Sequence, residues 1–304
     1  MKVSFGVCAD LHTEFIHDAP MRMEQFLNDC KEYNVDFCVN LGDFCPPGEV
    51  NLEHKNEILG MISSSSIPFH HVLGNHDMDE NSKSEVLEFV GGRAPHASFD
   101  VGGIHFVILD ACHFKTVDGY ASYDYGNYKA ALAENVPVLP PSELEWLKSD
   151  LEAAKYPSVI FSHQSLIESR TGIRNPEDFR RVIRSAPNKV IMAMCGHEHV
   201  DRAELLEGVW YVCINSMSYY WAGERYDHQT YGKDIESAYP LLRFVFPYKE
   251  AVYAIVTISD QGITIKGKDS KIVGALPESM NFKKSGFKEK ITASISNREL
   301  IRKG

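Results

Sequence analysis

Short runs of apolar and β-branched residues recur along the first 215 positions, separated by stretches with a different spacing. The runs Val3 to Ala9, Phe37 to Leu41 and Val190 to Cys195 have the length and composition of buried strands. Met21 to Tyr33 instead places apolar side chains three or four positions apart, which predicts an amphipathic helix. Strands that alternate with helices in this way indicate an α/β fold.

Proline, serine and glycine mark further elements. The Pro-Pro pair at 140–141 introduces a helix with Ser142 as its predicted N-cap, and Asn175 precedes another helix. A Gly-Gly pair at 102–103 and a Gln-Gly pair at 261–262 each join two strand-like runs, so each predicts a hairpin.

Two long segments do not follow this rhythm. Positions 111–141 and 216–240 contain many tyrosines but little periodicity. Long loops without a pattern are often functional in a compact domain, so both are interpreted as walls beside a substrate. The alternative, that their aromatic side chains pack the loops against the body, is equally consistent with the sequence.

The chain is interpreted as a catalytic domain over residues 1–269 followed by a carboxyl-terminal arm over 270–304. The arm is rich in lysine and weakly apolar. We expect it to be docked on the domain or to lie in a subunit contact, which leaves a homo-oligomer open.

Composition narrows the class of protein. Apolar residues make up 44% and charged residues 24%, as in an ordinary globular protein. No apolar run is long enough to cross a membrane, and the amino end enters a strand without the sections of a signal peptide. Seven cysteines without regular spacing argue against a disulfide framework, so the cytoplasm is the expected compartment.

The net charge narrows the class of ligand that the protein is expected to bind. A value of −11 argues against a nucleic-acid polymer as ligand, because that ligand needs a basic surface. The same charge is compatible with a small phosphate compound, since divalent cations reverse the local sign.

Metal-seeking side chains follow the predicted strands in six short segments. Carboxylate, amide and imidazole groups at strand ends indicate a ligand crevice, because that is where an open α/β sheet binds its ligands. The residues concerned are Asp10, His12, Asp43, Asn75, His76, Asp77, His163, His197 and His199.

The order Asp-x-His, Gly-Asp, Gly-Asn-His-Asp, lone His and Gly-His-x-His resembles the calcineurin-like metallophosphoesterase superfamily, over roughly Lys2 to Asn215. The context is most similar to the branch of cyclic-nucleotide and glycerophosphodiester phosphodiesterases. The resemblance implies an α-β-β-α sandwich of two sheets, with helices outside.

The resemblance also implies a site for two divalent cations, Mn, Fe or Zn, with the Asp43 carboxylate bridging them. A hydroxide shared by the cations would attack phosphorus, and His76 would face the leaving-group oxygen. One cation would be held by Asp10, His12, Asp43 and His199, and the other by Asp43, Asn75, His163 and His197.

Two positions depart from the family pattern. Many members carry a second carboxylate three residues after the bridging Asp, where it orients the catalytic His. Here that position is Pro46, so His76 needs another partner or none. This favours the diesterase branch over the protein phosphatases. The lone-His motif is His163-Gln164-Ser165 in place of the more usual His-x-Pro, and we expect Ser165 to alter the turn rather than metal ligation.

The leading hypothesis is therefore a phosphodiesterase or pyrophosphohydrolase acting on a small nucleotide-like or glycerol-based substrate. A phosphomonoesterase is the alternative, and a non-catalytic scaffold or a nuclease fits less well. Arg170 and Arg174 are candidates for clamping phosphate, although a solvated loop explains them as well. The remaining candidate substrate-binding residues are Tyr219, Tyr220, Trp221 and His113.

Overall fold

The computed structural model describes residues 2–44, 46–129, 137–282 and 291–301. Alternate residues of its first strand, β1 (Lys2–Cys8), point into a central core. Val3, Phe5 and Val7 are fully buried there, because successive side chains of a strand face opposite sides of its sheet. The first sheet has the strand order β16-β15-β14-β1-β2-β3, in which β15 is Gly262–Gly267 and β16 is Arg298–Leu300. Strands β1, β2 (Phe37–Asn40) and β3 (Phe69–His71) are parallel, and β1 pairs antiparallel with β14 (Ala254–Ser259).

The second sheet has the order β10-β11-β9-β8-β5-β4. Its central strands β5 (Ile104–Ile108), β8 (Ser158–Phe161), β9 (Val190–Cys195) and β11 (Val209–Cys213) are parallel. The strands β4 (Ala97–Val101) and β10 (Arg202–Leu206) close its two edges in antiparallel pairing.

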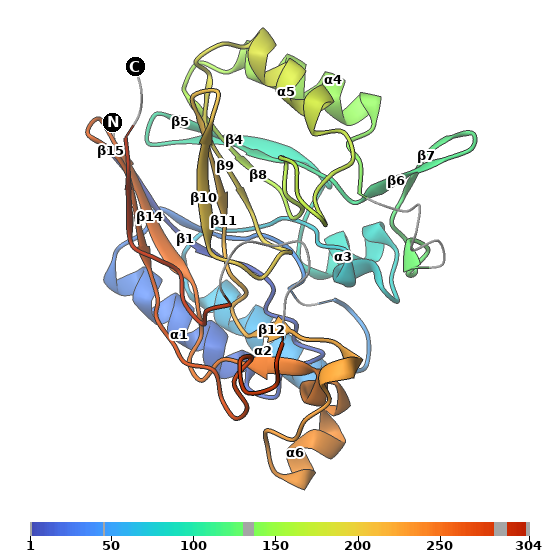
Figure 1. Cartoon of the computed structure of the whole chain (residues 1–304). Coiled ribbons are helices and arrows are strands. Elements are labelled where there is room, and N and C mark those ends of the chain that lie inside the picture. Colours follow the sequence, from blue (N-terminus) through green and yellow to red (C-terminus); the bar gives the residue numbers. More distant parts are fainter. Residues whose placement is uncertain (1, 45, 130–136, 283–290, 302–304) are drawn as a thin grey trace.

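The two sheets pack face to face, and helices cover their outer faces. Side chains such as Phe5, Phe106 and Phe161 from both sheets meet in one core cluster. Helices α1 (Ala19–Glu32) and α2 (Leu52–Ser64) cover the first sheet, and α4 (Pro141–Ala153) and α5 (Pro176–Ser185) cover the second (Figure 1). The predicted α-β-β-α sandwich is confirmed.

The predicted hairpins are present, whereas some boundaries differ from the predictions. Helix α4 begins at Pro141, and Pro140 rather than Ser142 is its N-cap, so that prediction was wrong. A proline suits the first helical position because its fixed φ is helical and its missing N–H needs no partner. Strand β3 ends at His71, where its pairing with β2 stops.

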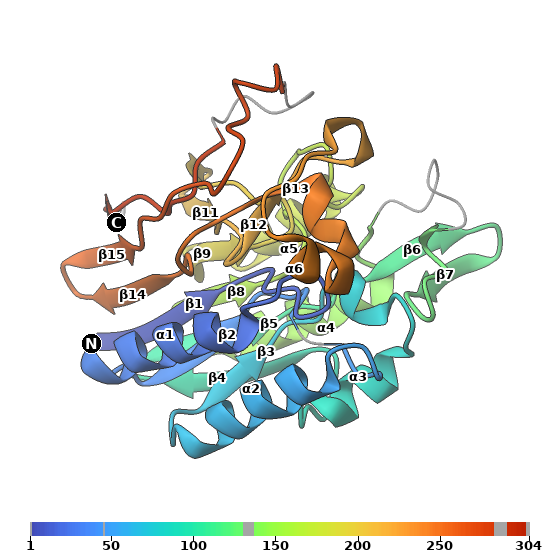
Figure 2. The ribbon, with the colours of Figure 1, turned by 90° about the horizontal axis from the view of Figure 1, so that it is seen from below.

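Both long tyrosine-rich segments contain short elements. Strands β6 (His113–Thr116) and β7 (Gly119–Ser122) form a hairpin that projects from the body (Figure 2). The second segment holds β12 (Tyr219–Trp221), which pairs with β13 (Val245–Pro247). The shorter helices complete the fold: η1 (His76–Met78), α3 (Lys83–Phe89), η3 (Glu224–Tyr226), α6 (Lys233–Ala238) and η4 (Pro240–Phe244).

The described part of the carboxyl-terminal arm lies against the body. Strand β15 (Gly262–Gly267) extends the first sheet, and β16 (Arg298–Leu300) pairs with it as the edge strand. Phe282 packs against Tyr220 and Tyr226, so another part of the arm reaches the tyrosine-rich segment. Among the described helices, none has the length and hydropathy that crossing a membrane would require.

Candidate metal centre

The loops that follow β1, β2, β3, β8 and β9 carry all seven predicted ligands. Strands β1, β2 and β3 are parallel in one sheet, and β8 and β9 are parallel in the other. The loops that follow them therefore leave from the same edge of each sheet, at the carboxyl ends of the strands. Asp10 is tied to the next loop by a hydrogen bond from its N–H to the Gly42 carbonyl, 3.0 Å long. The carboxylate of Asp10 also accepts the backbone N–H of His197 at 3.0 Å.

Most of the predicted ligands adopt a left-handed backbone conformation. The φ angles are 54° at Asp10, 53° at His12, 51° at Asp43, 64° at His197 and 49° at His199. Residues other than glycine rarely adopt such angles, and they concentrate at functional sites, where the surroundings hold them in place. The tight turns aim several side chains from different strands at one point.

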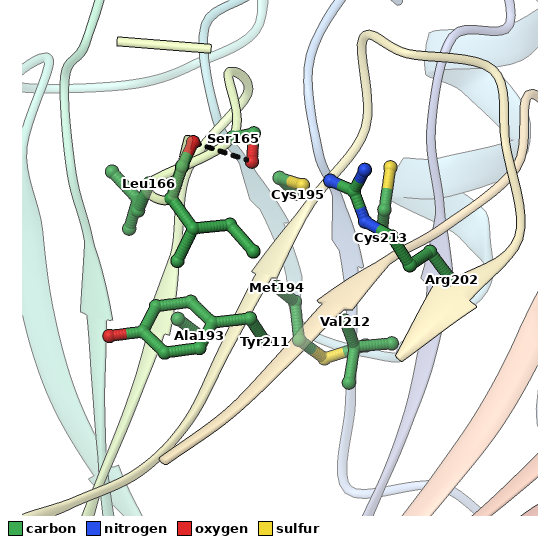
Figure 3. Close-up of a pocket in the computed structure, with 10 residues that line it drawn as sticks. Ser165, Leu166, Ala193, Met194, Cys195, Arg202, Tyr211, Val212 and Cys213 are labelled. Atoms are coloured by element: carbon green, nitrogen blue, oxygen red, sulfur yellow. Dashed lines mark hydrogen bonds between the residues drawn. The ribbon is translucent and has the colours of Figure 1, made fainter. Parts of the chain in front are cut away.

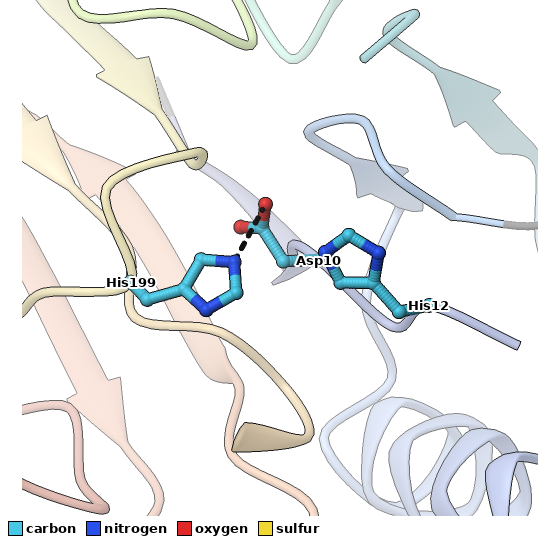
Figure 4. Close-up of side chains that lie close together, drawn as sticks. All are labelled: Asp10, His12 and His199. Carbon is cyan, nitrogen blue, oxygen red and sulfur yellow. Dashed lines mark ion pairs between the residues drawn. The ribbon is translucent and has the colours of Figure 1, made fainter. Parts of the chain in front are cut away.

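The first group of side chains consists of Asp10, His12 and His199 (Figure 4). One ligand atom from each lies within 4.8 Å of the others, and all three residues are buried. His199 Nε2 is 3.3 Å from Asp10 Oδ1. Two imidazoles and a carboxylate at this separation form three sides of a cation site.

The second group consists of Asp43, His163 and His197, with Asn75 beside them. His163 Nε2 lies 3.1 Å from Asp43 Oδ2, 3.1 Å from Asn75 Oδ1 and 3.1 Å from His197 Nδ1. Two ring nitrogens so close together need either a proton or a cation between them, because two lone pairs facing each other repel.

A single carboxylate oxygen faces both groups. Asp43 Oδ2 is 3.1 Å from His163 Nε2 and 3.8 Å from His12 Nε2. Oxygen and imidazole ligands without thiolate suit Mn, Fe or Zn. The side chains present therefore fit two cations that share the Asp43 carboxylate.

Burial and mutual charge set the protonation of these groups. Burial favours the neutral acid, but the imidazoles of His199 and His163 outweigh it and place the pKa of Asp10 below its usual value. Burial lowers the pKa of His197 to about 3. Burial also opposes a charge on His163, but the Asp43 carboxylate outweighs it and raises the pKa of His163 to about 9. A cation would thus meet a neutral His197 and displace a proton from His163.

Hydrogen bonds from outside orient the ligand rings. His12 Nδ1 lies 3.2 Å from Glu14 Oε1, and His163 Nδ1 is 2.7 Å from the Leu41 carbonyl. His199 Nδ1 donates to the Tyr219 carbonyl at 2.9 Å. Such partners fix which ring nitrogen faces the metal. Glu14 was not predicted, although its position two residues after His12 is a signal for this role.

Glycine is required where the loops approach each other most closely. A Cβ on Gly74 would lie 2.1 Å from the Asp43 nitrogen and 2.2 Å from its Oδ1. A Cβ on Gly196 would lie 2.7 Å from Asp10 Oδ2. Side chains at these two positions would occupy the space of the ligands.

Asp77 holds two of the loops together. Its carboxylate accepts backbone N–H groups from Gly74 at 2.8 Å, Phe44 at 2.9 Å and Asp43 at 3.1 Å. This supports the turn that carries Asn75 and His76, and burial together with Asp43 raises the pKa of Asp77 to about 7.

His76 stands beside the first group. Its ring centroid is 5.3 Å from that of His12, and its backbone N–H donates to Asp43 Oδ1 at 2.7 Å. Its Nδ1 lies 2.8 Å from Asp79 Oδ2, which is the partner that position 46 does not supply. Burial disfavours a charged ring, but Asp43 and Asp79 outweigh it and raise the pKa of His76 to about 9.

A cavity of about 630 Å³ opens over both groups. Of the candidate substrate-binding residues, Arg170, Tyr219, Tyr220 and Trp221 line it, together with ligands from both groups and His76. Phe15, Tyr226 and Phe282 add to its aromatic wall. Tyr226 belongs to the segment 216–240 that was interpreted as a substrate wall, whereas Phe15 and Phe282 were not predicted from the sequence. Phe282 comes from the carboxyl-terminal arm, whose sequence carries no signal for this position.

Two candidates lie elsewhere. Arg174 and His113 are not among the described residues that line this cavity. The backbone N–H of Arg174 donates to the Pro137 carbonyl at 2.8 Å, and His113 Nε2 is 3.7 Å from Asp110 Oδ2. The tyrosines of positions 111–141 do not all follow one interpretation. Tyr123 is packed in a core cluster, as expected if the aromatic side chains hold the loop against the body, whereas Tyr120 and Tyr125 are exposed.

A second, much smaller cavity of about 10 Å³ lies beside β9 and β11 (Figure 3). Met194, Val212, Tyr211 and Arg202 are among the side chains around it. A volume of this size holds about one water molecule. It has no room for a substrate.

The chain belongs to the calcineurin-like phosphoesterase family, whose model matches residues 3–201. Members of this family typically bind two divalent metals, and the groups around Asp10 and Asp43 match that requirement. None of the curated proteins matches the chain.

Solved structures of similar fold have low sequence identity. A dimetal phosphatase from Danio rerio has a TM-score of 0.64 and 14% identity, over 87% of this chain and 95% of that chain. GAP50, described as the anchor in the inner membrane complex of Plasmodium, has a TM-score of 0.57 and 13% identity, over 100% and 90%. A putative 5'-nucleotidase from Staphylococcus aureus has a TM-score of 0.50 and 12% identity, over 91% and 55%. At these identities the likeness concerns the fold.

Proposed function

We propose that this chain is a dimetal phosphoester hydrolase, and that it acts as a phosphodiesterase or pyrophosphohydrolase. The observation that carries the proposal is the position of Asp43 Oδ2 between two imidazole-bearing groups, beneath a cavity that His76 also lines. Asp10, His12, Asp43 and His199 would hold one cation. Asp43, Asn75, His163 and His197 would hold the other.

Two bound divalent cations would activate a water and neutralise charge on the phosphoryl group. The chain itself contributes orientation and a proton. The bonds from Glu14, the Leu41 carbonyl and the Tyr219 carbonyl hold the ligand rings in place before substrate enters. The Asp43 and Asp79 carboxylates raise the pKa of His76 to about 9, which favours a protonated ring. His76 would donate this proton to the departing oxygen, a role commonly worth about 10²–10⁴-fold in rate.

The cavity supports a diester over a monoester. Its volume of about 630 Å³ exceeds the space that a phosphoryl group needs and lies in the range of sites for small molecules. Arg170 is the only arginine or lysine among the described residues that line it, whereas aromatic side chains are abundant. A second, uncharged substituent on phosphorus fits such a wall better than a second negative charge.

The aromatic wall supports a nucleotide-like substrate, and a glycerol-based diester is the other member of this class. Trp221 is 43% exposed, and its ring centroid lies 6.4 Å from that of Phe15. Phe15 in turn stacks on the ligand His12 at 5.3 Å. A planar group attached to phosphorus would meet this surface directly beside the cation site.

A scaffold is the second candidate, because GAP50 is described as an anchor and has a similar fold. The buried metal-ligating groups argue against it here, since collecting carboxylates and imidazoles without a function is costly. A small phosphoester remains the proposed partner. The six cysteines in the described part of the chain are free and buried, which supports a reducing compartment such as the cytoplasm.

The test is hydrolysis of bis(p-nitrophenyl) phosphate and p-nitrophenyl phosphate by metal-free protein after Mn²⁺, Fe²⁺ or Zn²⁺ is restored. We expect metal-dependent turnover that favours the diester, with His76→Ala slowed. Preference for the monoester would instead support a phosphomonoesterase. Bound metal without turnover of either compound would favour the scaffold.

A further inference from the structure

We propose that Asp79 is a positioning residue for His76, and that the Tyr128 hydroxyl holds both Asp79 and the metal ligand Asn75. The inference rests on the proposed function in two respects, namely that His76 acts on the leaving group and that Asn75 is a metal ligand. It assigns to Asp79 the place of the carboxylate that Pro46 cannot provide.

The contact between the two side chains fixes the orientation of the ring. His76 Nδ1 lies 2.8 Å from Asp79 Oδ2, a distance at which the ring N–H donates to the carboxylate. Because Nδ1 is engaged, Nε2 is the ring nitrogen left to face the cavity that His76 lines. The local backbone explains the pairing, since His76 begins the 3-10 helix η1 and Asp79 caps it. Side chains three positions apart lie above one another in such a helix.

Asp79 is itself held from the other side. The Tyr128 hydroxyl lies 2.5 Å from Asp79 Oδ1, and Lys129 Nζ lies 2.8 Å from Asp79 Oδ2. With Tyr128 and Lys129 as donors, both carboxylate oxygens are engaged and the side chain cannot rotate freely. Hydrogen bonds to an ionised carboxylate are stronger than those between neutral groups.

The same hydroxyl also reaches the metal ligand. Asn75 Nδ2 donates to the Tyr128 oxygen at 3.2 Å, so the hydroxyl accepts one bond and donates another. This decides the orientation of the Asn75 amide, whose Oδ1 then lies 3.1 Å from His163 Nε2 in the second group. Tyr128 stacks on the buried Tyr123 with ring centroids 4.5 Å apart, which fixes the ring that carries the hydroxyl.

The segment after β7, which carries Tyr128, thus supports side chains of the site, although its sequence shows no periodicity that would predict this role. A single hydroxyl oxygen of this segment contacts Asn75 directly and reaches His76 through Asp79. Loss of such a support commonly reduces activity about 10–100-fold without removing a ligand.

The first test needs neither metal nor substrate. The ¹⁵N shifts of the His76 ring in metal-free protein, assigned by comparison with His76→Ala, report whether Nδ1 carries a proton. We expect a protonated Nδ1 in the wild type and in Glu80→Gln, which removes an exposed carboxylate one residue away from Asp79. In Asp79→Asn we expect the signal to shift and broaden. An unchanged His76 signal in Asp79→Asn would overturn the inference.

The second test is a double-mutant cycle with the metal-loaded protein. Asp79→Asn should lower kcat for the diester about 10–100-fold, with KM and metal content unchanged. Tyr128→Phe should act in the same direction to a smaller extent. In a His76→Ala background, Asp79→Asn should have no further effect, because the group that it positions is gone.

An equal loss in both backgrounds would show a purely structural role for Asp79 and refute the inference. A wild-type protein that binds metal but hydrolyses no phosphoester would refute the proposed function instead. In that case the ¹⁵N shifts still decide whether Asp79 positions the His76 ring.

Discussion

The backbone N–H of His76 donates a hydrogen bond to Asp43 Oδ1 at 2.7 Å, while Asp43 Oδ2 faces both groups of metal-ligating side chains. The two oxygens of one carboxylate thus serve two purposes. One would bridge the cations, and the other sets the position of the proposed proton donor relative to them. A single residue would therefore fix where the proposed acid lies relative to the cations.

The variant Asp43→Asn tests the bridging of the cations separately from the hydrogen bond to the His76 N–H. The amide oxygen can still accept the His76 N–H, but the negative charge between the two groups is lost. We expect at least one cation to be lost and turnover of the diester to fall by at least about 100-fold. Elemental analysis of the dialysed protein and steady-state rates measure the two effects.

The matched control is Asp118→Asn, which removes the same charge from an exposed position in the β6–β7 turn. It should retain wild-type metal content and rate. Two bound cations in Asp43→Asn would contradict the bridging role.

Gly74→Ala tests how closely the loops approach each other. The added methyl would fall 2.1 Å from the Asp43 nitrogen, so the backbone must move away from the ligand. We expect weaker metal binding and a loss of about 2 kcal/mol or more in the free energy of unfolding, as for overpacking elsewhere.

Gly60→Ala is the comparison for this variant, because a Cβ there meets nothing within 4 Å. Gly60 lies within helix α2, and alanine should stabilise the protein by about 0.5–1 kcal/mol. Denaturant titration measures both variants. A neutral Gly74→Ala would show that the loops can separate without cost.

His105 should make stability depend on pH. Its Nδ1 lies 2.7 Å from Asp100 Oδ1 and its Nε2 lies 2.8 Å from Asp150 Oδ2. Burial opposes a charge, but these two bonds outweigh it and raise the pKa of His105 above its usual value. The stabilisation is therefore fully present below about pH 6.5, the pKa of an unfolded histidine, and is lost as pH rises through the folded value.

Asp150→Asn should then cost about 1 kcal/mol near pH 6 and less near pH 9, after allowance for solvent screening. Ser98→Ala removes an uncharged donor to the same carboxylate, so its cost should not vary with pH. Unfolding free energies at the two pH values distinguish the variants. Equal costs for Asp150→Asn at both would refute the charged state of His105.

The edge strand β16 should depend on Asp201. The Asp201 carboxylate accepts from Arg298 Nη1 at 2.6 Å and from the Ser296 N–H at 2.9 Å. Asp201→Asn should lower the local stability of residues 296–300 by about 1–2 kcal/mol, which faster amide hydrogen exchange would reveal. Glu299→Gln on the same strand, at an exposed position, is the control. Unchanged exchange in Asp201→Asn would mean that backbone pairing alone holds the strand.

The apolar runs predicted the alternation of strands and helices, whereas the two-sheet arrangement and the proposed ligand set came from the resemblance to the family. The candidate ligands follow apolar runs, and a run such as Val3 to Ala9 predicts both a strand and the position where that strand ends. The structure brings Asp10, Asp43 and His163 to one place because the parallel strands of each sheet end at the same edge.

What the sequence did not reveal lies in the loops. Asp79, Tyr128 and Phe282 reach the site through segments whose course depends on tertiary contacts and leaves no periodic signal. Arg174 and Arg170 look alike in sequence, yet only Arg170 is among the described residues that line the cavity. The absence of an acid at Pro46 was visible, whereas the contact between His76 and Asp79 became apparent only from the distance between the side chains.

The central place of β1 in the first sheet has a consequence for biosynthesis. Val3 faces Ile258 across the β1–β14 pair, so one edge of the earliest strand stays unpaired until about 250 further residues have been made. At roughly 5–20 residues per second, that takes on the order of tens of seconds on the ribosome. During this interval β1 can pair with β2 alone, and its other edge stays open until β14 has been made.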